Sequence, residues 1–293
     1  MTDAEPHAGE SLLSFRGVSF RYPGTPAGTP PAIDGVDLEL RPGDRVGVVG
    51  PNGGGKTTLV KLALGLFRPG QGEVRINGDV ARWSSHVPRV GYIGNPSRND
   101  GESGLPLDLT LGRLLDAHAA LFGDDGYDRE RAAELARRLD LDKPQWRAKP
   151  IAALSDGWRQ RALAYLALAK GPALLIADEA TAGLDPPHRR AVLAVIADTL
   201  ASTDMAVLWV THDHNELFAL SLSRVYQVTL GRIEPVSLAG WRCEVAVDGG
   251  EPGGLDLTPD AVFKLVGELL TNPDCREVRL AMSRRPPGEV PEA

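Results

Sequence analysis

The chain has 293 residues, of which 42% are hydrophobic, and it carries a formal net charge of −7. A chain of this length and composition can bury at least one complete core, so we expect a globular protein. An acidic balance without a block of Lys and Arg excludes a surface that tracks nucleic acid, because such binding needs clustered basic residues. No nucleic-acid partner is expected, and any bound anion must be held by a local site.

The sequence offers neither a secretory signal nor a membrane span. Its first residues, MTDAEPHAGE, are polar and acidic, unlike a signal peptide. The longest apolar stretch, residues 162–177, is interrupted by Lys-Gly-Pro at 170–172, which makes it too short to cross a bilayer. We therefore expect a cytoplasmic protein, or one that lies peripherally at the inner face of the cell membrane.

The first part of the chain predicts strands around a glycine-rich loop. Residues 13–21 and 36–40 have strand character, and a loop rich in Pro, Gly and Thr separates them at 23–31. Residues 45–49, RVGVV, are short, apolar and β-branched, as a fully buried strand requires, and helical character follows at 57–67. The predicted order is strand, glycine loop, helix.

The middle of the chain alternates between helices and strands. Two further buried strands are predicted at 173–177 and 206–210, preceded by helical residues at 159–169 and 187–200. This alternation predicts an α/β fold with a mostly parallel sheet that helices cover on both faces. Apolar residues at 110–141 instead recur at helical spacing with no strand among them, so this block is predicted to be a helical insertion.

The character of the sequence changes again after Glu234-Pro235. Residues 243–247 alternate like a strand, Thr258-Pro259 is typical of a helix start, and residues 279–282 favour a last strand. We predict a small C-terminal α+β appendage of unknown role at 236–293.

A phosphate-binding loop is predicted between the strand at 45–49 and the helix that follows it. The pattern Gly-x-x-x-x-Gly-Lys-Thr occurs there in the strand-loop-helix context that it requires, which disfavours a glycine-rich turn that binds nothing. In such a loop the backbone N–H groups converge on phosphate oxygens, and the helix N-terminus adds a positive dipole end. Lys56 supplies a full charge and the Thr57 hydroxyl is a Mg²⁺ ligand. The residues assigned to nucleotide binding in this loop are Gly50, Pro51, Asn52, Gly53, Gly54, Gly55, Lys56, Thr57 and Thr58.

Two carboxylates end the apolar run at 174–177. Asp178 falls at the carboxyl end of the predicted strand, where ligands of open α/β sheets bind, and it is the expected Mg²⁺ partner. Glu179, one residue further on, is placed to polarise a water for attack on a γ-phosphate. Without the phosphate loop upstream, an acidic turn at a strand end would be the simpler interpretation.

The stretch Leu154-Ser155-Asp156-Gly157-Trp158 precedes the predicted helix at 159–169. Alone it is a helix N-cap, with Ser155 or Asp156 as the capping residue. Together with the phosphate loop and the two carboxylates, it resembles the signature motif LSGGQ of the ATPase subunits of the ATP-binding cassette (ABC) family. The resemblance implies that Ser155 and Gly157 cap the γ-phosphate of an ATP held by a partner subunit.

Further positions support the resemblance, which covers about residues 13–235. Tyr22 lies where the family places an aromatic residue that stacks on adenine. The stretch Thr181-Ala182-Gly183-Leu184-Asp185 resembles the loop by which two subunits sense each other, and Asp185 is assigned to that contact. The stretch Thr211-His212-Asp213 resembles the switch whose histidine contacts the γ-phosphate. The resemblance thus implies an ATPase with ATP and Mg²⁺ as its ligands, in which Glu179 and His212 act in catalysis.

Three positions depart from the pattern of the family: Trp158 stands where the signature motif has a glutamine, and Asn95 and Asp156 are the other two. Asn95 stands where the family carries a glutamine that touches Mg²⁺ and the attacking water, so Asn95 is assigned to catalysis and to the metal. It keeps the amide but is one methylene shorter, and an intervening water would bridge the difference. Asp156 places a carboxylate near the expected γ-phosphate. The sequence predicts ATP hydrolysis and leaves open whether Asn95 and Asp156 slow it.

The resemblance implies an ABC-type ATPase domain at 11–235, with an antiparallel β subdomain and a helical insertion at about 97–165. The predicted function is an ATPase subunit that dimerises with a second copy or a homologous ATPase subunit and powers transport through separate integral membrane subunits. Two alternatives stay open: a soluble ABC ATPase without membrane partners, and a nucleotide-binding regulator with slow or no turnover. Residues 109–115, followed by Leu121-Phe122-Gly123, are similar to exporter-type ATPases, which favours export.

Overall fold

The structure is a computed structural model that describes residues 11–26, 28–82, 89–95, 105–122, 127–236, 241–247, 253–255 and 278–284. Its strands are β1 (Leu13–Phe20), β2 (Ile33–Leu40), β3 (Arg45–Val49), β4 (Gln71–Ile76), β5 (Asp79–Val80), β6 (Val90–Ile93), β7 (Leu174–Asp178), β8 (Ala206–Val210), β9 (Arg224–Thr229), β10 (Arg232–Val236), β11 (Trp241–Val247), β12 (Gly253–Leu255) and β13 (Val278–Arg284). Its helices are α1 (Lys56–Ala63), α3 (Leu111–Phe122), α4 (Arg129–Arg138), α5 (Pro144–Arg147), the short 3₁₀ helix η1 (Ile151–Ala153), α6 (Asp156–Leu168), α7 (Pro186–Ser202) and α8 (His214–Ala219). In these described ranges, no helix combines the length and the apolar character that crossing a bilayer demands.

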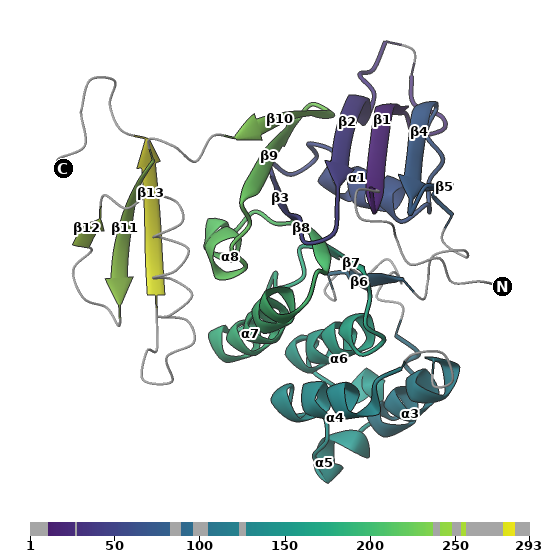
Figure 1. Ribbon diagram of the computed structural model, residues 1–293, viewed down its shortest axis with the longest axis vertical. Helices are drawn as coiled ribbons and strands as arrows, with labels where there is room; N and C mark the ends of the chain where they lie inside the picture. Colours follow the sequence, from purple (N-terminus) through teal and green to yellow (C-terminus); the bar gives the residue numbers. More distant parts are fainter. Residues whose placement is uncertain are drawn as a thin grey trace.

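A six-stranded sheet lies at the centre, in the order β10-β9-β3-β8-β7-β6 (Figure 1). Strand β3 pairs in parallel with β8 and β9, and β7 pairs in parallel with β8 and β6. Strands β7 and β8 are buried along their whole length, as expected for parallel strands covered on both faces. The predicted α/β fold with a mostly parallel sheet is therefore confirmed.

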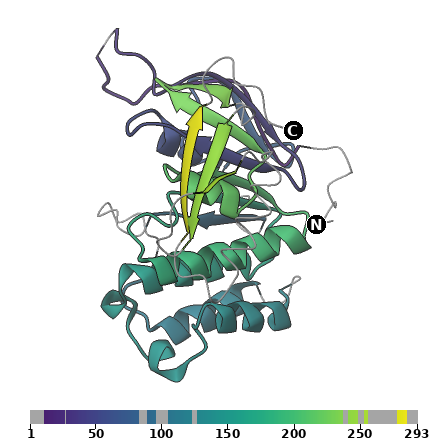
Figure 2. The ribbon, with the colours of Figure 1, turned by 90° about the vertical axis from the view of Figure 1, so that its left-hand side faces the viewer.

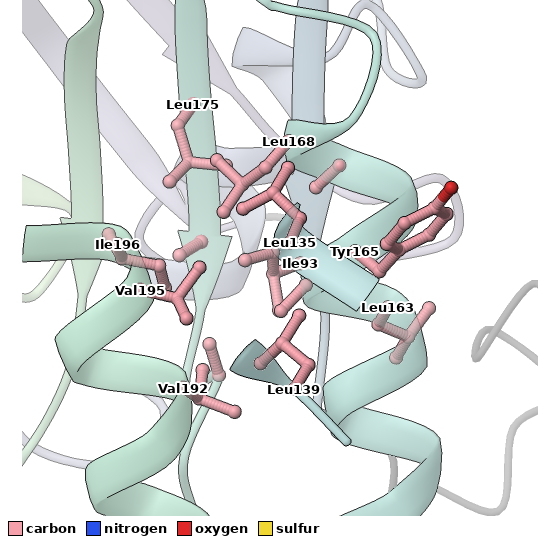
Figure 3. Close-up of a cluster of buried hydrophobic side chains, with 14 of the residues drawn as sticks. Ile93, Leu135, Leu139, Leu163, Tyr165, Leu168, Leu175, Val192, Val195 and Ile196 are labelled. Carbon is pink, nitrogen blue, oxygen red and sulfur yellow. The ribbon is translucent and has the colours of Figure 1, made fainter. Parts of the chain in front are cut away.

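The central sheet separates two hydrophobic clusters, because successive side chains of a strand point to opposite faces. Leu175 of β7 belongs to the cluster under helices α4, α6 and α7, whereas its neighbour Leu174 belongs to the cluster on the α1 side. Figure 3 shows the first cluster, in which side chains of α4, α6 and α7 pack against Ile93 and Leu175. Each such buried aliphatic side chain contributes about 1.5–3 kcal/mol, so the two clusters fix the positions of the strand ends.

A second, antiparallel sheet has the order β2-β1-β4-β5 and shares its buried face with α1. The antiparallel β subdomain implied by the resemblance is thus present, although β4 and β5 were not predicted as strands. Helices α3, α4 and α5 and the short helix η1 lie between β6 and β7 in the sequence. Both ribbon views place the antiparallel sheet and these helices at opposite ends of the molecule, with the central sheet between them (Figures 1 and 2).

Beyond residue 240 the described strands form a separate three-stranded sheet, in the order β12-β11-β13. The strands predicted at 243–247 and 279–282 fall within β11 and β13. The helix predicted after Thr258-Pro259 lies outside the described residues.

Candidate active site

Neighbouring parallel strands bring the predicted site residues to one edge of the central sheet. The phosphate loop follows β3, the two carboxylates end β7, and the stretch with His212 follows β8. The ladder continues past the strand ends, since the Glu179 N–H donates to the Val210 carbonyl at 2.9 Å and the Thr211 N–H to the Val48 carbonyl at 3.1 Å. Residues more than 120 positions apart in the sequence therefore meet at this edge.

Two glycines of the phosphate loop are required by their conformation and surroundings. Gly50 has φ +152°, and a Cβ there would lie 2.3 Å from the Val228 carbonyl oxygen. Gly55 has φ +112°, and a Cβ there would lie 2.5 Å from the Ala32 carbonyl oxygen. Only glycine adopts such a backbone without strain and leaves room for the opposing chain. The loop therefore turns tightly into α1, whose N-terminus faces the site.

Lys56 supplies the positive charge of the loop and is buried. Its ammonium donates hydrogen bonds to the carbonyl oxygens of Gly50 and Pro51, at 2.8 and 3.1 Å, and lies 3.9 Å from Oε1 of Glu179. These contacts hold the charge inside the loop, where the N–H groups of the α1 N-terminus add to it. A chain with a net charge of −7 thus contains a local site for an anion.

A pocket of about 410 Å³ opens over the phosphate loop. Its lining residues are Tyr22, Ala32, Asn52, Gly53, Gly55, Lys56, Thr57, Thr58 and Glu179. Tyr22 is 42% exposed, its hydroxyl lies 2.9 Å from the Thr58 hydroxyl, and its ring packs edge-on against Phe20 and Phe67. The pocket therefore combines a phosphate-sized cradle with an aromatic wall, as a nucleotide requires.

Replacing Tyr22 with alanine is expected to weaken ATP binding about 10-fold, because a base stacked on an aromatic ring gains about 1–3 kcal/mol. Tyr22→Phe is the matched control, since it keeps the ring and removes only the hydrogen bond to Thr58. Titration with a fluorescent ATP analogue measures both variants. Equal affinities of the alanine variant and the wild type would show that Tyr22 does not carry the base.

Glu179 lies between Lys56 and His212. Its Oε1 is 3.9 Å from the Lys56 ammonium and 3.7 Å from Nδ1 of His212, whose side chain is largely exposed. Glu179 also has φ +51°, in the left-handed region, which costs a residue with a side chain about 1–3 kcal/mol. This strained backbone, fixed by the hydrogen bond to Val210, holds the carboxylate at the pocket wall.

The residues predicted to hold a metal come from three elements. Asp178 is buried at the end of β7, Thr57 lines the pocket at the start of α1, and Asn95 follows β6. The Gly94 carbonyl, next to Asn95, accepts a hydrogen bond at 3.0 Å from the buried Gln160 side chain of α6. Sequence reasoning missed Gln160, because nothing local signals a contact across 66 residues.

Ser155, Gly157 and Asp185 do not line the pocket, and they lie at the N-termini of α6 and α7. Ser155 is the N-cap residue of α6, without a side-chain capping bond, and Asp185 caps α7. His188 connects the two helices: its Nδ1 is 2.7 Å from Oδ1 of Asp185, and a Cβ on Gly157 would lie 2.6 Å from its ring. Hydrogen bonds from the backbone N–H and the side chain of His188 lower the pKa of Asp185. Sequence reasoning missed His188, although the spacing Asp-x-x-His at a helix start is a signal.

Asp156 and Trp158, the two residues of the signature stretch that differ from LSGGQ, each contact other side chains of the chain. The Trp158 ring stacks on Trp146 of α5 with ring centroids 3.9 Å apart, and the Arg161 guanidinium lies 4.8 Å from the Trp158 ring. The Asp156 carboxylate lies 3.3 Å from the Arg159 guanidinium. Trp158 thus packs against the helical insertion, and Arg159 offsets part of the charge that Asp156 brings.

The fold and this geometry define a P-loop nucleotide-binding protein. The family model described as ABC transporter matches residues 33–182, which is more than half of the chain. The chain therefore belongs to the ABC transporter family, and the resemblance stated from the sequence is confirmed.

Relatives with different cargoes match the chain. The methionine import ATP-binding protein MetN of Mesorhizobium japonicum is 34% identical over 79% of this chain and 62% of its own length. The lipoprotein-releasing system ATP-binding protein LolD of Maricaulis maris is 34% identical over 72% of this chain and 91% of its own length. The chain thus spans less than two thirds of the methionine import relative, and import and release systems match at equal identity.

Solved structures share the fold. The ATP-binding cassette MJ0796, in a dimeric post-hydrolysis state bound to ADP and phosphate, superposes with a TM-score of 0.65 at 22% identity. The superposition covers 78% of this chain and 100% of that one. This likeness places the present chain in the ABC cassette fold.

Proposed function

We propose that the chain is the ATP-binding and ATP-hydrolysing subunit of an ABC transporter, which powers transport through separate membrane-spanning partners. The observation that carries this proposal is the position of the Glu179 carboxylate, at the wall of a phosphate-loop pocket and within 4 Å of both Lys56 and His212. The pocket holds the nucleotide, and the carboxylate supplies a base at the phosphate end.

In the proposed reaction, Lys56 and the N–H groups of the phosphate loop bind and orient the β- and γ-phosphates. Glu179 accepts a proton from the attacking water, so that the water adds to the γ-phosphorus as the bond to the ADP oxygen breaks. His212 donates a hydrogen bond to the γ-phosphate and keeps the Glu179 carboxylate in place. A preorganised site of this kind acts chiefly by positioning and by electrostatic stabilisation.

Mg²⁺ fits the donors present. Asp178, Thr57 and Asn95 offer a carboxylate, a hydroxyl and an amide oxygen, which are the hard oxygen ligands that Mg²⁺ prefers. When bound, the ion neutralises charge on the phosphate oxygens.

The second part of the proposal is ATP-driven dimerisation. Ser155, Gly157 and Asp185 lie at the starts of α6 and α7 and outside the pocket of their own chain, which suits contact with ATP held by a second copy or a homologous subunit. A helix N-terminus favours an anion, so the γ-phosphate of the partner's ATP would strengthen this contact. Loss of the γ-phosphate would then shift the equilibrium back to monomers.

The membrane association of the chain would be peripheral, at the inner face of the cell membrane, through its transporter partners. Residues 11–235 would form the ATPase domain, with the helical insertion at about 97–165, and residues 236–293 a small module of unknown role. The relatives include both import and release systems, which supports an ATP-binding transport subunit and favours no direction of transport.

Phosphate release by the purified chain tests the proposed function. With Mg²⁺ and ATP, the wild type is expected to release phosphate, and chelation of Mg²⁺ should abolish the release. Nucleotide binding without any phosphate release would instead favour a nucleotide-binding regulator, the alternative suggested by Asn95 and Asp156.

A further inference from the structure

Glu216, in α8, is a buried carboxylate with no part in the reaction described above. The residue is 3% exposed. Its Oε2 accepts a hydrogen bond at 2.7 Å from the indole N–H of Trp209, and its Oε1 accepts one from the Thr181 hydroxyl. The Thr211 hydroxyl is a third donor beside the carboxylate and lowers its pKa. Burial raises the pKa of Glu216, and these three donors oppose that rise.

The surroundings make a purely space-filling role costly. A buried carboxylate loses its hydration and is tolerated only when donors replace the water, whereas an apolar side chain of similar size would need none. Thr181 and Trp209 are themselves fully buried, so losing Glu216 would leave the Thr181 hydroxyl and the Trp209 indole N–H without the hydrogen bonds that they donate to it. A satisfied polar network of this kind fixes one arrangement of the segments that it joins.

The first hydroxyl donor belongs to the turn that carries Glu179. Thr181 lies two residues after Glu179, and the Ala182 N–H donates to the Glu179 carbonyl at 3.0 Å. The Leu184 N–H donates to the Thr181 carbonyl at 3.2 Å, which continues the turn towards Asp185. Holding the Thr181 side chain therefore holds the strained backbone of Glu179.

The second hydroxyl donor belongs to the segment that carries His212. Thr211 directly precedes His212, and the Thr211 oxygen accepts a hydrogen bond at 3.0 Å from the Asp213 N–H. The Asp213 carboxylate in turn caps α8 and pairs with Arg189 of α7 at 2.7 Å. The backbone on both sides of His212 is thus tied to the helix that holds Glu216.

We infer that Glu216 is a positioning residue. Its carboxylate connects the turn after Glu179 to the segment with His212, and this connection fixes the relative positions of the Glu179 and His212 side chains at the γ-phosphate. The connection runs through Thr181 on one side and Thr211 on the other. Its kinetic consequence rests on the proposed ATPase function, whereas its structural consequence does not.

A double-mutant cycle on the two threonines tests the kinetic consequence. Thr181→Val and Thr211→Val are isosteric and leave Glu216 with two of its donors, and each is expected to lower kcat about tenfold with the ATP affinity within about threefold of wild type. The double variant should be at most about twofold slower than the slower single variant, because the loss of either hydroxyl already breaks the connection through Glu216. Thr199→Val is the matched control, since among the described residues this buried hydroxyl bonds within α7, to the Val195 carbonyl at 2.8 Å, and its loss should leave kcat unchanged.

Hydrogen–deuterium exchange without nucleotide tests the structural consequence. In Thr211→Val the amides of Ala182 and Leu184, about 30 positions away in the sequence, should exchange about tenfold faster than in the wild type, and Thr199→Val should leave them unchanged. If the wild-type protein released no phosphate, the proposed function would be wrong. The exchange experiment needs no ATP turnover, so it would still test the positioning role of Glu216. Unchanged exchange at Ala182 and Leu184, or kcat losses that multiply to about 100-fold in the double variant, would overturn the role of Glu216.

Discussion

Replacing Glu179 with glutamine is expected to lower the rate of ATP turnover about 10²-fold or more, because the amide cannot accept a proton from the attacking water. The change keeps the volume of the side chain and removes a negative charge 3.9 Å from the Lys56 ammonium. ATP affinity should therefore be unchanged or higher, so the loss appears in kcat. Phosphate release at saturating Mg²⁺-ATP measures it.

Glu134→Gln is the control for this change. Glu134 lies on the exposed face of α4, where it pairs with Arg137, and its replacement also removes one negative charge. Its turnover should equal that of the wild type. A Glu179→Gln variant that kept at least one tenth of the wild-type turnover would show that another group acts as the base.

Replacing Lys56 with alanine has the largest expected effect on binding. The buried ammonium is the one full positive charge among the residues that line the described pocket, and a charged hydrogen bond is worth about 1.5–3 kcal/mol. The affinity for Mg²⁺-ATP should fall about 10- to 100-fold, as measured by titration with a fluorescent ATP analogue. ATP should also raise the unfolding temperature of the variant less than that of the wild type at equal nucleotide concentration.

Lys61→Ala is the matched control, because Lys61 lies on the same helix and contacts Phe67 instead of the pocket. Its affinity should stay within about threefold of wild type, since loss of a partly exposed charge has a small effect. Undiminished affinity after the loss of Lys56 would remove the basis for the nucleotide site.

The parts of the fold that the sequence predicts best are the buried parallel strands. Strands β3 and β8 begin and end at the predicted residues, and β7 is shifted by one, because a strand covered on both faces is a continuous apolar run. Strand β4 escaped prediction because Gly72 follows an exposed Gln71, and Glu73 and Arg75 are paired on its partly exposed face. Its strand character comes from pairing with β1, which is not visible in a local pattern.

The residues of the candidate site likewise fall into those that a local motif predicts and those that depend on distant contacts. The phosphate loop and the pair Asp178-Glu179 are contiguous motifs, so their chemistry can be predicted from residue types and spacing. Gln160, His188 and Glu216 each have a contact with a residue 31 to 66 positions away, such as the bond from Gln160 to the Gly94 carbonyl. Such contacts depend on how α6, α7 and α8 pack, and no single stretch of the sequence encodes them.

The central claim is that ATP joins the chain to a second ATPase subunit through the helix N-termini that carry Ser155, Gly157 and Asp185, and in purified protein that subunit is a second copy of the chain. Light scattering after size exclusion measures it directly on the Glu179→Gln variant, which retains ATP. At saturating Mg²⁺-ATP the measured mass should be twice the chain mass of 31.3 kDa, and with Mg²⁺-ADP it should equal one chain. A variant that binds ATP yet stays at the mass of one chain would contradict the account.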